Sequence, residues 1–405
     1  MRKYESKIGF GLRQWTVIGL LISSWALAVL ARLLWNGEVF GLNYRLFHPD
    51  GICYGALSYD FAGQTSIGRR ELAQAYADQG TPIDSFGIDI NDSAPCGNWV
   101  RPRVLYSLLT APFVNLFGYY GMLVIPALSW LVAILVPVAL LLKRGLLLTP
   151  AIAGLLIIAS TSVGRWSVAN GTDALLMGIM ALSLPLLPIF ERRFKLWRIL
   201  LFLSLIILGS LTRQSWPFWM VVVLTPWIAY GLMNRSRGIQ AAWVSGNPWT
   251  WFMSFGIGTA LASWQIIDAY LGSQNSAYVF RELQMTFQEF EAADPRGSSA
   301  FLGEALSVVL QSVTALVLEA GQLVVLDKAL LIAIGLALVG AYQNRKWTAS
   351  YAFFGVLFVG VALHALNAAQ GVNFRFAMVA VPWIVLLGGI WREPATEVPE
   401  QLGPG

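Results

Sequence analysis

The chain has 405 residues, of which 57% are apolar and only 12% carry a charge, and its mean hydropathy is +0.62. Soluble domains usually hold about 25% charged residues, so this composition excludes an ordinary soluble globular protein. A membrane-spanning helix needs roughly 20 mostly apolar residues, and the apolar runs predict an all-α polytopic membrane protein with about ten such helices.

The first apolar run covers residues 15–35 and is too long for the core of a cleavable signal peptide. No small-residue cleavage site follows it, so we expect a retained first span. The preceding tail is basic, with Arg2, Lys3, Lys7 and Arg13. The positive-inside rule therefore predicts a cytoplasmic N-terminus and an outward first loop.

Residues 36–103 form this long outward loop, in which short helices are expected at 50–61 and 69–79. Gly80 and Pro82 are typical of the end of a helix. The next apolar run, 104–117, is too short to span a bilayer and is followed by interrupting glycines. We interpret it as a half-length or interfacial helix.

Nine further spans are expected along the rest of the chain. They are expected at 119–142, 146–163, 172–190, 199–211, 216–233, 249–271, 325–342, 349–366 and 374–391. A second outward segment covers 272–324 and includes an amphipathic stretch at 303–318. The prediction is a single membrane domain, 1–392, with a cytoplasmic tail, 393–405.

The charges divide between the two faces as this topology requires. The predicted cytoplasmic side carries fifteen of the 27 Lys and Arg but only five of the 22 Asp and Glu. Within the spans, the ionisable residues fall near the outward ends, as Arg32, Asp268, Asp327 and His364 do. Transporters place such groups near the midplane, so this distribution favours an enzyme working at the outer face.

An acidic residue near the start of the outward loop is the first candidate for catalysis. Asp50 lies in the run His48-Pro49-Asp50-Gly51. It is suited to cap a short helix, because its carboxylate can accept backbone N–H groups. It is also suited to act as a general base, and the two roles are compatible because a capped carboxylate stays ionised. His48 and the nearby Tyr54 are interpreted as positioning residues.

A pair of arginines enters the half-length helix at Arg101-Pro102-Arg103. Cations at a helix N-terminus oppose the helix dipole, so they favour a bound anion. Arginine binds phosphate in a forked geometry, and we expect a substrate phosphate on at least one of them. The alternative is pairing with acids of the same loop, Asp84, Asp89 and Asp92.

Three further outward turns carry arginine at the expected depth of the lipid headgroups. They contain Arg165 with Asn170 and Asp173, Arg213 with Gln214, and Arg375. We predict that Arg213 and Arg375 contact the same phosphate and that the others position substrate. The alternative is that each arginine reaches out to lipid phosphates.

The only two cysteines, Cys53 and Cys96, both lie in the first outward loop, which is predicted to face an oxidising compartment. They are candidates for a disulfide, and two unpaired thiols are the alternative. With two histidines and no Cys/His cluster, the sequence indicates no zinc site.

The arrangement of these residues resembles the C-type (GT-C) superfamily of polytopic membrane glycosyltransferases. The resemblance lies in the acid of HPDGICY, the run RPRVLYSLL, and the later segments NGTDALL, LTRQS and FRFAMVAVP. It covers about residues 10–392 in topology. Relatives often carry a second acid, whereas here Gly51 follows Asp50 and Gln214 follows Arg213. The resemblance therefore specifies neither a metal requirement nor a subfamily, and a divalent metal is possible but not indicated.

This resemblance implies inverting transfer of a sugar from a polyprenyl-phosphate donor to a glycan, lipid or protein hydroxyl. Asp50 would take the proton from the acceptor, and arginines would neutralise the departing phosphate. We expect an integral membrane protein of a bacterial inner or plasma membrane with an outward active site, and the charge distribution predicts that both termini are cytoplasmic. No nucleic-acid-binding module is visible in the sequence, so no nucleic-acid partner is expected. A flippase or transporter of a lipid-linked saccharide, and a non-catalytic assembly subunit, are the alternatives.

Overall fold

A computed structural model gives the fold of the chain, and its described secondary-structure elements are helices apart from one short hairpin. The hairpin pairs β1 (Glu38–Val39) with β2 (Leu42–Asn43) in antiparallel register. The structure describes residues 10–34, 38–39, 42–43, 49–78, 103–169, 171–189, 195–213, 215–238, 240, 243, 247–270, 314, 317, 321, 324–367 and 375–391.

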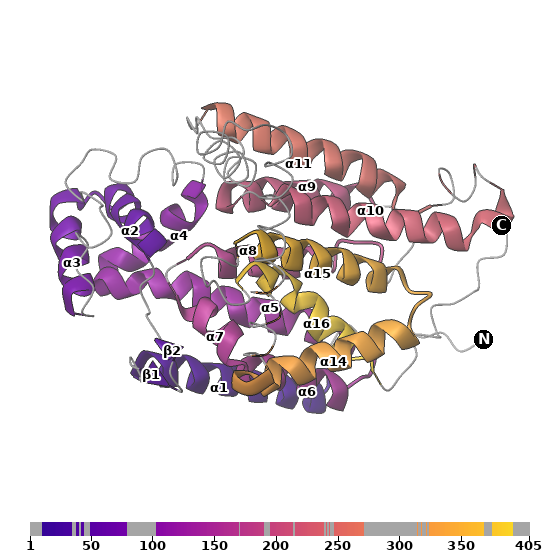
Figure 1. Ribbon diagram of the computed structural model, residues 1–405, viewed down its shortest axis with the longest axis horizontal. Coiled ribbons are helices and arrows are strands. Elements are labelled where there is room, and N and C mark those ends of the chain that lie inside the picture. Colours follow the sequence, from indigo (N-terminus) through magenta and orange to yellow (C-terminus); the bar gives the residue numbers. More distant parts are fainter. Residues whose placement is uncertain are drawn as a thin grey trace, which may run out of the picture.

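The helices run roughly along the long axis of the molecule, with a small group of helices at one end (Figure 1). That end group consists of α2 (Pro49–Phe61), α3 (Thr65–Asp78), α4 (Val104–Phe117) and η4 (Gly118–Leu123). The bundle consists of α1 (Leu12–Leu34), α5 (Val124–Leu142), α6 (Leu148–Ala159), α7 (Thr161–Val168), α8 (Asp173–Ser183), α9 (Leu196–Thr212), α10 (Trp216–Met233), α11 (Thr250–Tyr270), α14 (Lys328–Gln343), α15 (Thr348–Asn367) and α16 (Val381–Gly388). Two short 3-10 helices, η5 (Arg235–Arg237) and η8 (Arg375–Ala380), complete the described elements.

The chain is a helical membrane protein by the length and apolarity of its helices. Within the described residues, three helical runs are long and apolar enough to cross a bilayer: Leu12–Leu34, Val104–Leu142 and Trp216–Met233. The bent pair α6 and α7 would add a fourth. The structure therefore confirms the all-α class but not the predicted number of ten spans, because several apolar helices, such as α8 and α14, are shorter than a full span.

The run 104–142 folds back on itself and is not one straight rod. Gly118 has φ +59°, a left-handed value that favours glycine, and it ends α4. After it, Gly121 packs against the backbone of Phe113, where a side chain would overlap, and the Tyr106 hydroxyl donates to the Met122 carbonyl at 2.8 Å. This confirms the half-length helix predicted at 104–117, and it leaves α5, about 28 Å long, to cross the membrane alone.

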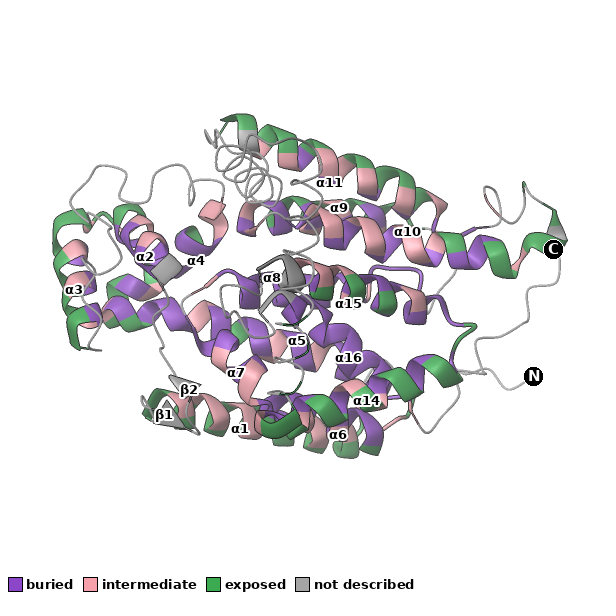
Figure 2. Cartoon of the chain, viewed as in Figure 1, coloured by how far each residue is buried: buried purple, intermediate pink, exposed green. Residues whose placement is uncertain are grey.

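The core of the bundle lies around α8, whose residues are all buried except Leu182 (Figure 2). Helix α8 contacts α5, α9, α16 and η8. Gly178 on α8 lies against Ser129 of α5 so closely that a Cβ there would be 3.0 Å from the serine Cβ. Small residues allow such close helix packing in membranes. Helices α1, α11 and α14 instead expose large apolar side chains on their outer faces.

The helix ends fall into two groups. At the end opposite to α2–α4, the Gln14 amide donates to the Leu142 carbonyl at 2.6 Å, and the Trp347 indole donates to the Ile189 carbonyl at 2.9 Å. The described charged side chains at that end are all basic: Arg13, Lys143, Arg144, Lys195, Arg198, Arg235, Arg345 and Lys346. The described acidic side chains lie toward the α2–α4 end.

Four sequence predictions need correction or lie outside the described residues. The span predicted at 146–163 is wrong as a continuous helix, because it breaks at Ser160 and bends by 66° between α6 and α7. The span predicted at 172–190 ends as a helix at Ser183, and the loop helix predicted at 69–79 begins earlier, at Thr65. The amphipathic stretch predicted at 303–318 lies outside the described residues, apart from isolated positions.

Candidate active site

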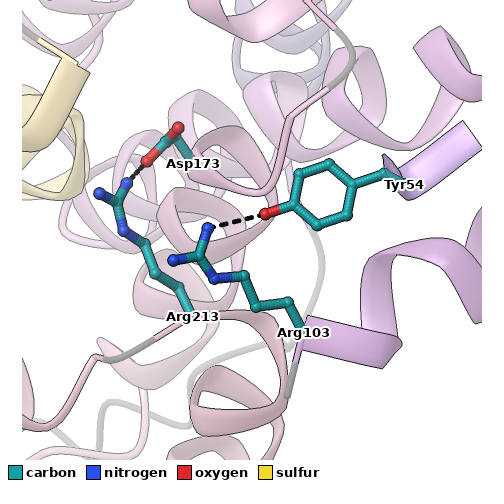
Figure 3. Close-up of polar contacts among 4 residues, drawn as sticks. All are labelled: Tyr54, Arg103, Asp173 and Arg213. Atoms are coloured by element: carbon teal, nitrogen blue, oxygen red, sulfur yellow. Dashed lines mark hydrogen bonds and ion pairs between the residues drawn. The ribbon is translucent and has the colours of Figure 1, made fainter. Parts of the chain in front are cut away.

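Four polar side chains from four different elements meet at the α2–α4 end of the bundle (Figure 3). They are Tyr54 of α2, Arg103 at the start of α4, Asp173 at the start of α8, and Arg213 at the end of α9. Helix α4 packs on both α2 and α9, and α8 packs on α9, which brings these positions together. Figure 3 places the Arg103 guanidinium between the Tyr54 ring and the Arg213 side chain.

The local sequence explains where α2 begins. Proline disfavours helical geometry in the residue before it and fits the first turn itself, so a helix starts at Pro49. Asp50 follows in the first turn, where the positive end of the helix dipole favours a carboxylate. The helix predicted at 50–61 is thus confirmed. Asp50 lies one helical turn before Tyr54, and its side chain lies outside the described part of the structure.

Tyr54 holds Arg103 through its hydroxyl group. Nη1 of Arg103 donates to the Tyr54 hydroxyl at 2.9 Å, and the Tyr54 side chain is fully buried, edge-on to Tyr106 at 5.4 Å. The Tyr54 carbonyl accepts from the hydroxyls of Ser58 at 2.6 Å and Ser107 at 3.0 Å. This buried polar contact fixes α2 against α4 and therefore fixes the direction of the tyrosine ring.

Asp173 and Arg213 form an ion pair between two antiparallel helices. Their side chains are 5% and 15% exposed, so most of each charge is removed from solvent. Arg213 stands at the C-terminal end of α9 and Asp173 at the N-terminal end of α8. Each charge therefore also faces the helix terminus of favourable polarity. The pairing explains how two charged residues are held at the edge of an apolar bundle.

The structure describes only some of the other predicted site residues. Arg165 lies in the last turn of α7, with its guanidinium 5.2 Å from the centre of the Trp166 ring. Arg375 begins η8, which packs on α7 and α8, although its side chain lies outside the described residues. Four predicted site residues fall wholly outside them: His48, Arg101, Asn170 and Gln214.

The structure describes one of the two cysteines that were predicted to form a disulfide. Cys53 is disulfide-bonded, and it precedes Tyr54 in α2. Cys96, the only other cysteine of the chain, itself lies outside the described residues. Among the residues that the structure describes, no three His, Cys, Asp or Glu side chains gather in a group that could hold a metal ion.

Helix α3 is fixed to α2 beside the site by a tyrosine–glutamate contact. The Tyr59 hydroxyl donates to Oε2 of Glu71 at 2.6 Å. Burial and this interaction with the glutamate raise the pKa of Tyr59 above its ordinary value. Gly68 of α3 lies directly against the Tyr59 ring, where any side chain would overlap it.

Sequence reasoning missed the partners of these residues. Asp173 and Arg213 were both predicted to contact substrate, but their ion pair was not predicted. Ser58, Ser107 and Thr110 were not singled out, although Ser58 and Thr110 share a buried hydrogen bond of 2.8 Å. Ser58 follows Tyr54 by four residues and Thr110 follows Ser107 by three, so each pair lies on one face of its helix. This spacing was the signal in the sequence that could have indicated them.

The arrangement can bind an anion between two half-buried guanidinium groups. Arg103 and Arg213 come from α4 and α9, two helices that pack on each other, and each guanidinium is already oriented by a partner side chain. Oriented guanidiniums match the oxygen geometry of phosphate and carboxylate.

The chain matches no protein-family model, no curated protein and no solved structure.

Proposed function

We propose that this protein is an integral-membrane glycosyltransferase. It would move a sugar from a polyprenyl-phosphate donor to an acceptor hydroxyl, with inversion at the anomeric carbon. The observation that carries the proposal is the meeting of Arg103 and Arg213 at one end of an apolar bundle, next to the helix that contains Asp50.

The surroundings of the two arginines support a donor with a lipid tail. Leu108 and Leu109 of α4 are 52% and 38% exposed, and Ile207 and Leu208 of α9 are 44% and 38% exposed. These apolar side chains lie within two helical turns of the arginine on the same helix. A ligand with an anionic head and a hydrocarbon tail would therefore find matching chemistry on both parts.

The division of charge supports an outward-facing site. The end opposite to the site carries the described basic clusters, such as Lys143-Arg144 and Arg345-Lys346, with no described acid beside them. Basic clusters favour the cytoplasmic side. The site would then face the outer side of a bacterial inner or plasma membrane, with both termini in the cytoplasm.

The proposed reaction is a single displacement at the sugar. The Asp50 carboxylate takes the proton of the acceptor hydroxyl while that oxygen forms a bond to the anomeric carbon. The bond between this carbon and the phosphate oxygen breaks, and its electron pair leaves with the polyprenyl phosphate. Arg103, Arg213 and Arg375 neutralise the leaving phosphate, which is the type of preorganised stabilisation that contributes most in many enzymes.

The test combines lipid identification with a matched pair of variants. Mass spectrometry of lipids that co-purify with the protein should find a polyprenyl phosphate, and Arg213→Gln should reduce its amount. In membranes supplied with radiolabelled polyprenyl-phosphate sugars, Asp50→Asn should lose transfer to endogenous acceptors by a factor of at least about 100. Asp60→Asn, an exposed position on the same helix, should keep it.

Full transfer by Asp50→Asn would remove Asp50 from the role of base. If wild-type membranes transfer no sugar and neither arginine affects lipid binding, the protein is a non-catalytic assembly subunit instead.

One observation favours transport of a lipid-linked saccharide as a second candidate. Discontinuous helices are common at the binding sites of transporters, and α6 and α7 form such a broken pair. The discriminating measurement is movement of the labelled lipid-linked sugar across liposomes that contain the purified protein and no acceptor. Movement at a rate unaffected by Asp50→Asn would support the transporter.

A further inference from the structure

Two charged residues, a partly buried arginine and a buried aspartate, lie outside the candidate active site, at the break between α6 and α7. Helix α6 rises about 18 Å from Leu148 before it ends. The chain turns by 66° at Ser160, and the eight-residue α7 begins. A break inside an apolar bundle leaves backbone groups without their helical partners, and in a membrane such groups must be satisfied by the protein.

Arg32 of α1 occupies the cationic side of the break. Its Nη2 donates to the Ser160 carbonyl at 2.9 Å, and its Nη1 donates to the Ala28 carbonyl at 3.1 Å. The guanidinium lies 5.0 Å from the centre of the Trp130 ring, within cation–π range. It passes directly over Gly164 of α7, where any Cβ would overlap the guanidinium.

Asp327, at the start of α14, occupies the anionic side. One carboxylate oxygen accepts from the Ser160 hydroxyl at 2.7 Å and from the Ser162 backbone N–H at 2.8 Å. The other oxygen accepts from the Leu330 backbone N–H at 3.0 Å. Asp327 is only 2% exposed. A single carboxylate thus caps two helices, α7 and α14, that are far apart in the sequence.

The two charges contact the residues that join the two helices. The Ser160 carbonyl that accepts from Arg32 follows the end of α6 and also accepts from the Gly164 N–H of α7 at 3.1 Å. Asp327 accepts from an N–H at the N-terminal end of α7, where the helix dipole favours a carboxylate. The protein therefore fills this break with its own charged groups. The same contacts fix the N-terminal end of α7 to α1 and α14.

The C-terminal end of α7 leads directly to the candidate active site. Val168 ends α7, and five residues later Asp173 begins α8 and pairs with Arg213. Because α7 is short and packs on α5, α8 and η8, its placement determines where the α7–α8 connection lies. We propose that Arg32 and Asp327 are positioning residues, which fix α7 and through it the Asp173 carboxylate that orients Arg213. For its effect on catalysis, this inference rests on the proposed function.

The primary experiment measures hydrogen exchange of the full-length protein in detergent and needs no activity. In Asp327→Asn, amides within residues 160–176 should exchange at least about tenfold faster, equivalent to about 1.4 kcal/mol of lost protection. Amides of α10, which packs mainly on α11 and α15, should exchange at the wild-type rate. Faster exchange confined to the start of α14, with 160–176 unchanged, would overturn the proposal.

A glycine pair supplies a second test if the aspartate variant does not fold. Gly164→Ala would displace the Arg32 guanidinium, whereas Gly335→Ala on α14 meets open space. Gly164→Ala alone should accelerate exchange at 160–176, and Gly335→Ala should not. In an Arg32→Ala background, where the cation is absent, Gly164→Ala should add little. Equal effects of the two glycine changes would contradict the role of Arg32.

The transfer assay then separates the two proposals. If Asp327 affects catalysis by orienting Arg213, Asp327→Asn should lower the transfer rate about tenfold in the otherwise wild-type protein. In the Arg213→Gln protein, adding Asp327→Asn should lower the rate no further. Full transfer by Asp327→Asn despite faster exchange would refute the link to the site. If the wild-type protein transfers no sugar but the exchange results hold, the proposed function fails while the fixing of α7 stands.

Discussion

Breaking the ion pair between Asp173 and Arg213 should reveal how strongly the site depends on it. Asp173→Asn removes the carboxylate charge with little change in volume and leaves Arg213 as a cation whose side chain is only 15% exposed. Loss of one partner of a buried pair costs about 3–5 kcal/mol. The remaining exposure of Arg213 and its place at a helix C-terminus reduce this, so we expect a loss of about 2–4 kcal/mol.

The double variant Asp173→Asn/Arg213→Gln distinguishes an unpaired charge from a general loss of packing. Because no buried cation is left, it should be less destabilised than the single aspartate variant, with a coupling energy of about 1–3 kcal/mol. The free energies would come from reversible denaturant unfolding of the purified protein in mixed micelles. Asp60→Asn, exposed on α2, should stay within about 0.5 kcal/mol of wild type. A double variant as unstable as the sum of the two singles would refute the reasoning.

Three further predictions concern the helices beside the site. Because the pKa of Tyr59 is raised above 10, the folded protein retains this proton at pH values where the unfolded chain loses it, so stability should fall as pH rises above 10. Unfolding midpoints from pH 9 to 11 should fall more steeply for wild type than for Tyr59→Phe, and equal slopes would contradict this. Gly68→Ala should lower the free energy of unfolding by about 1–3 kcal/mol, because the added Cβ overlaps the Tyr59 ring. Gly19→Ala, where the added Cβ on α1 meets open space, should not be destabilising in the same unfolding assay. Reduction of the disulfide at Cys53 should lower the free energy of unfolding by about 4 kcal/mol in the chain-entropy model, and Cys53→Ser should show the same stability with or without reductant.

Helix positions that depend on local sequence were predictable. Helix α10 begins and ends where the sequence predicts, at 216 and 233, because Pro217 suits a helix start and the apolar run is continuous. The end of α4 was predictable for a similar reason, since Gly118 adopts a positive φ that few other residues tolerate.

Features set by distant parts of the chain were not predictable. The apolar run through Ser160 reads as one span, and the break there depends on Asp327, 167 residues further along. In the candidate site, the sequence indicated that Arg103 and Arg213 would lie at the same face. It did not indicate that they would be held by Tyr54 and Asp173, because these contacts arise from the packing of α4 on α2 and of α8 on α9.

The short central helix has a consequence for how this protein enters a membrane. Helix α8 has 11 residues, roughly half the length that the insertion machinery needs to recognise a span, and it begins with an acid. Nearly all of it is surrounded by protein, so it never has to match the thickness of the lipid. We expect α8 to enter the bilayer only together with α5 and α9, which makes the assembly of the bundle cooperative during biosynthesis.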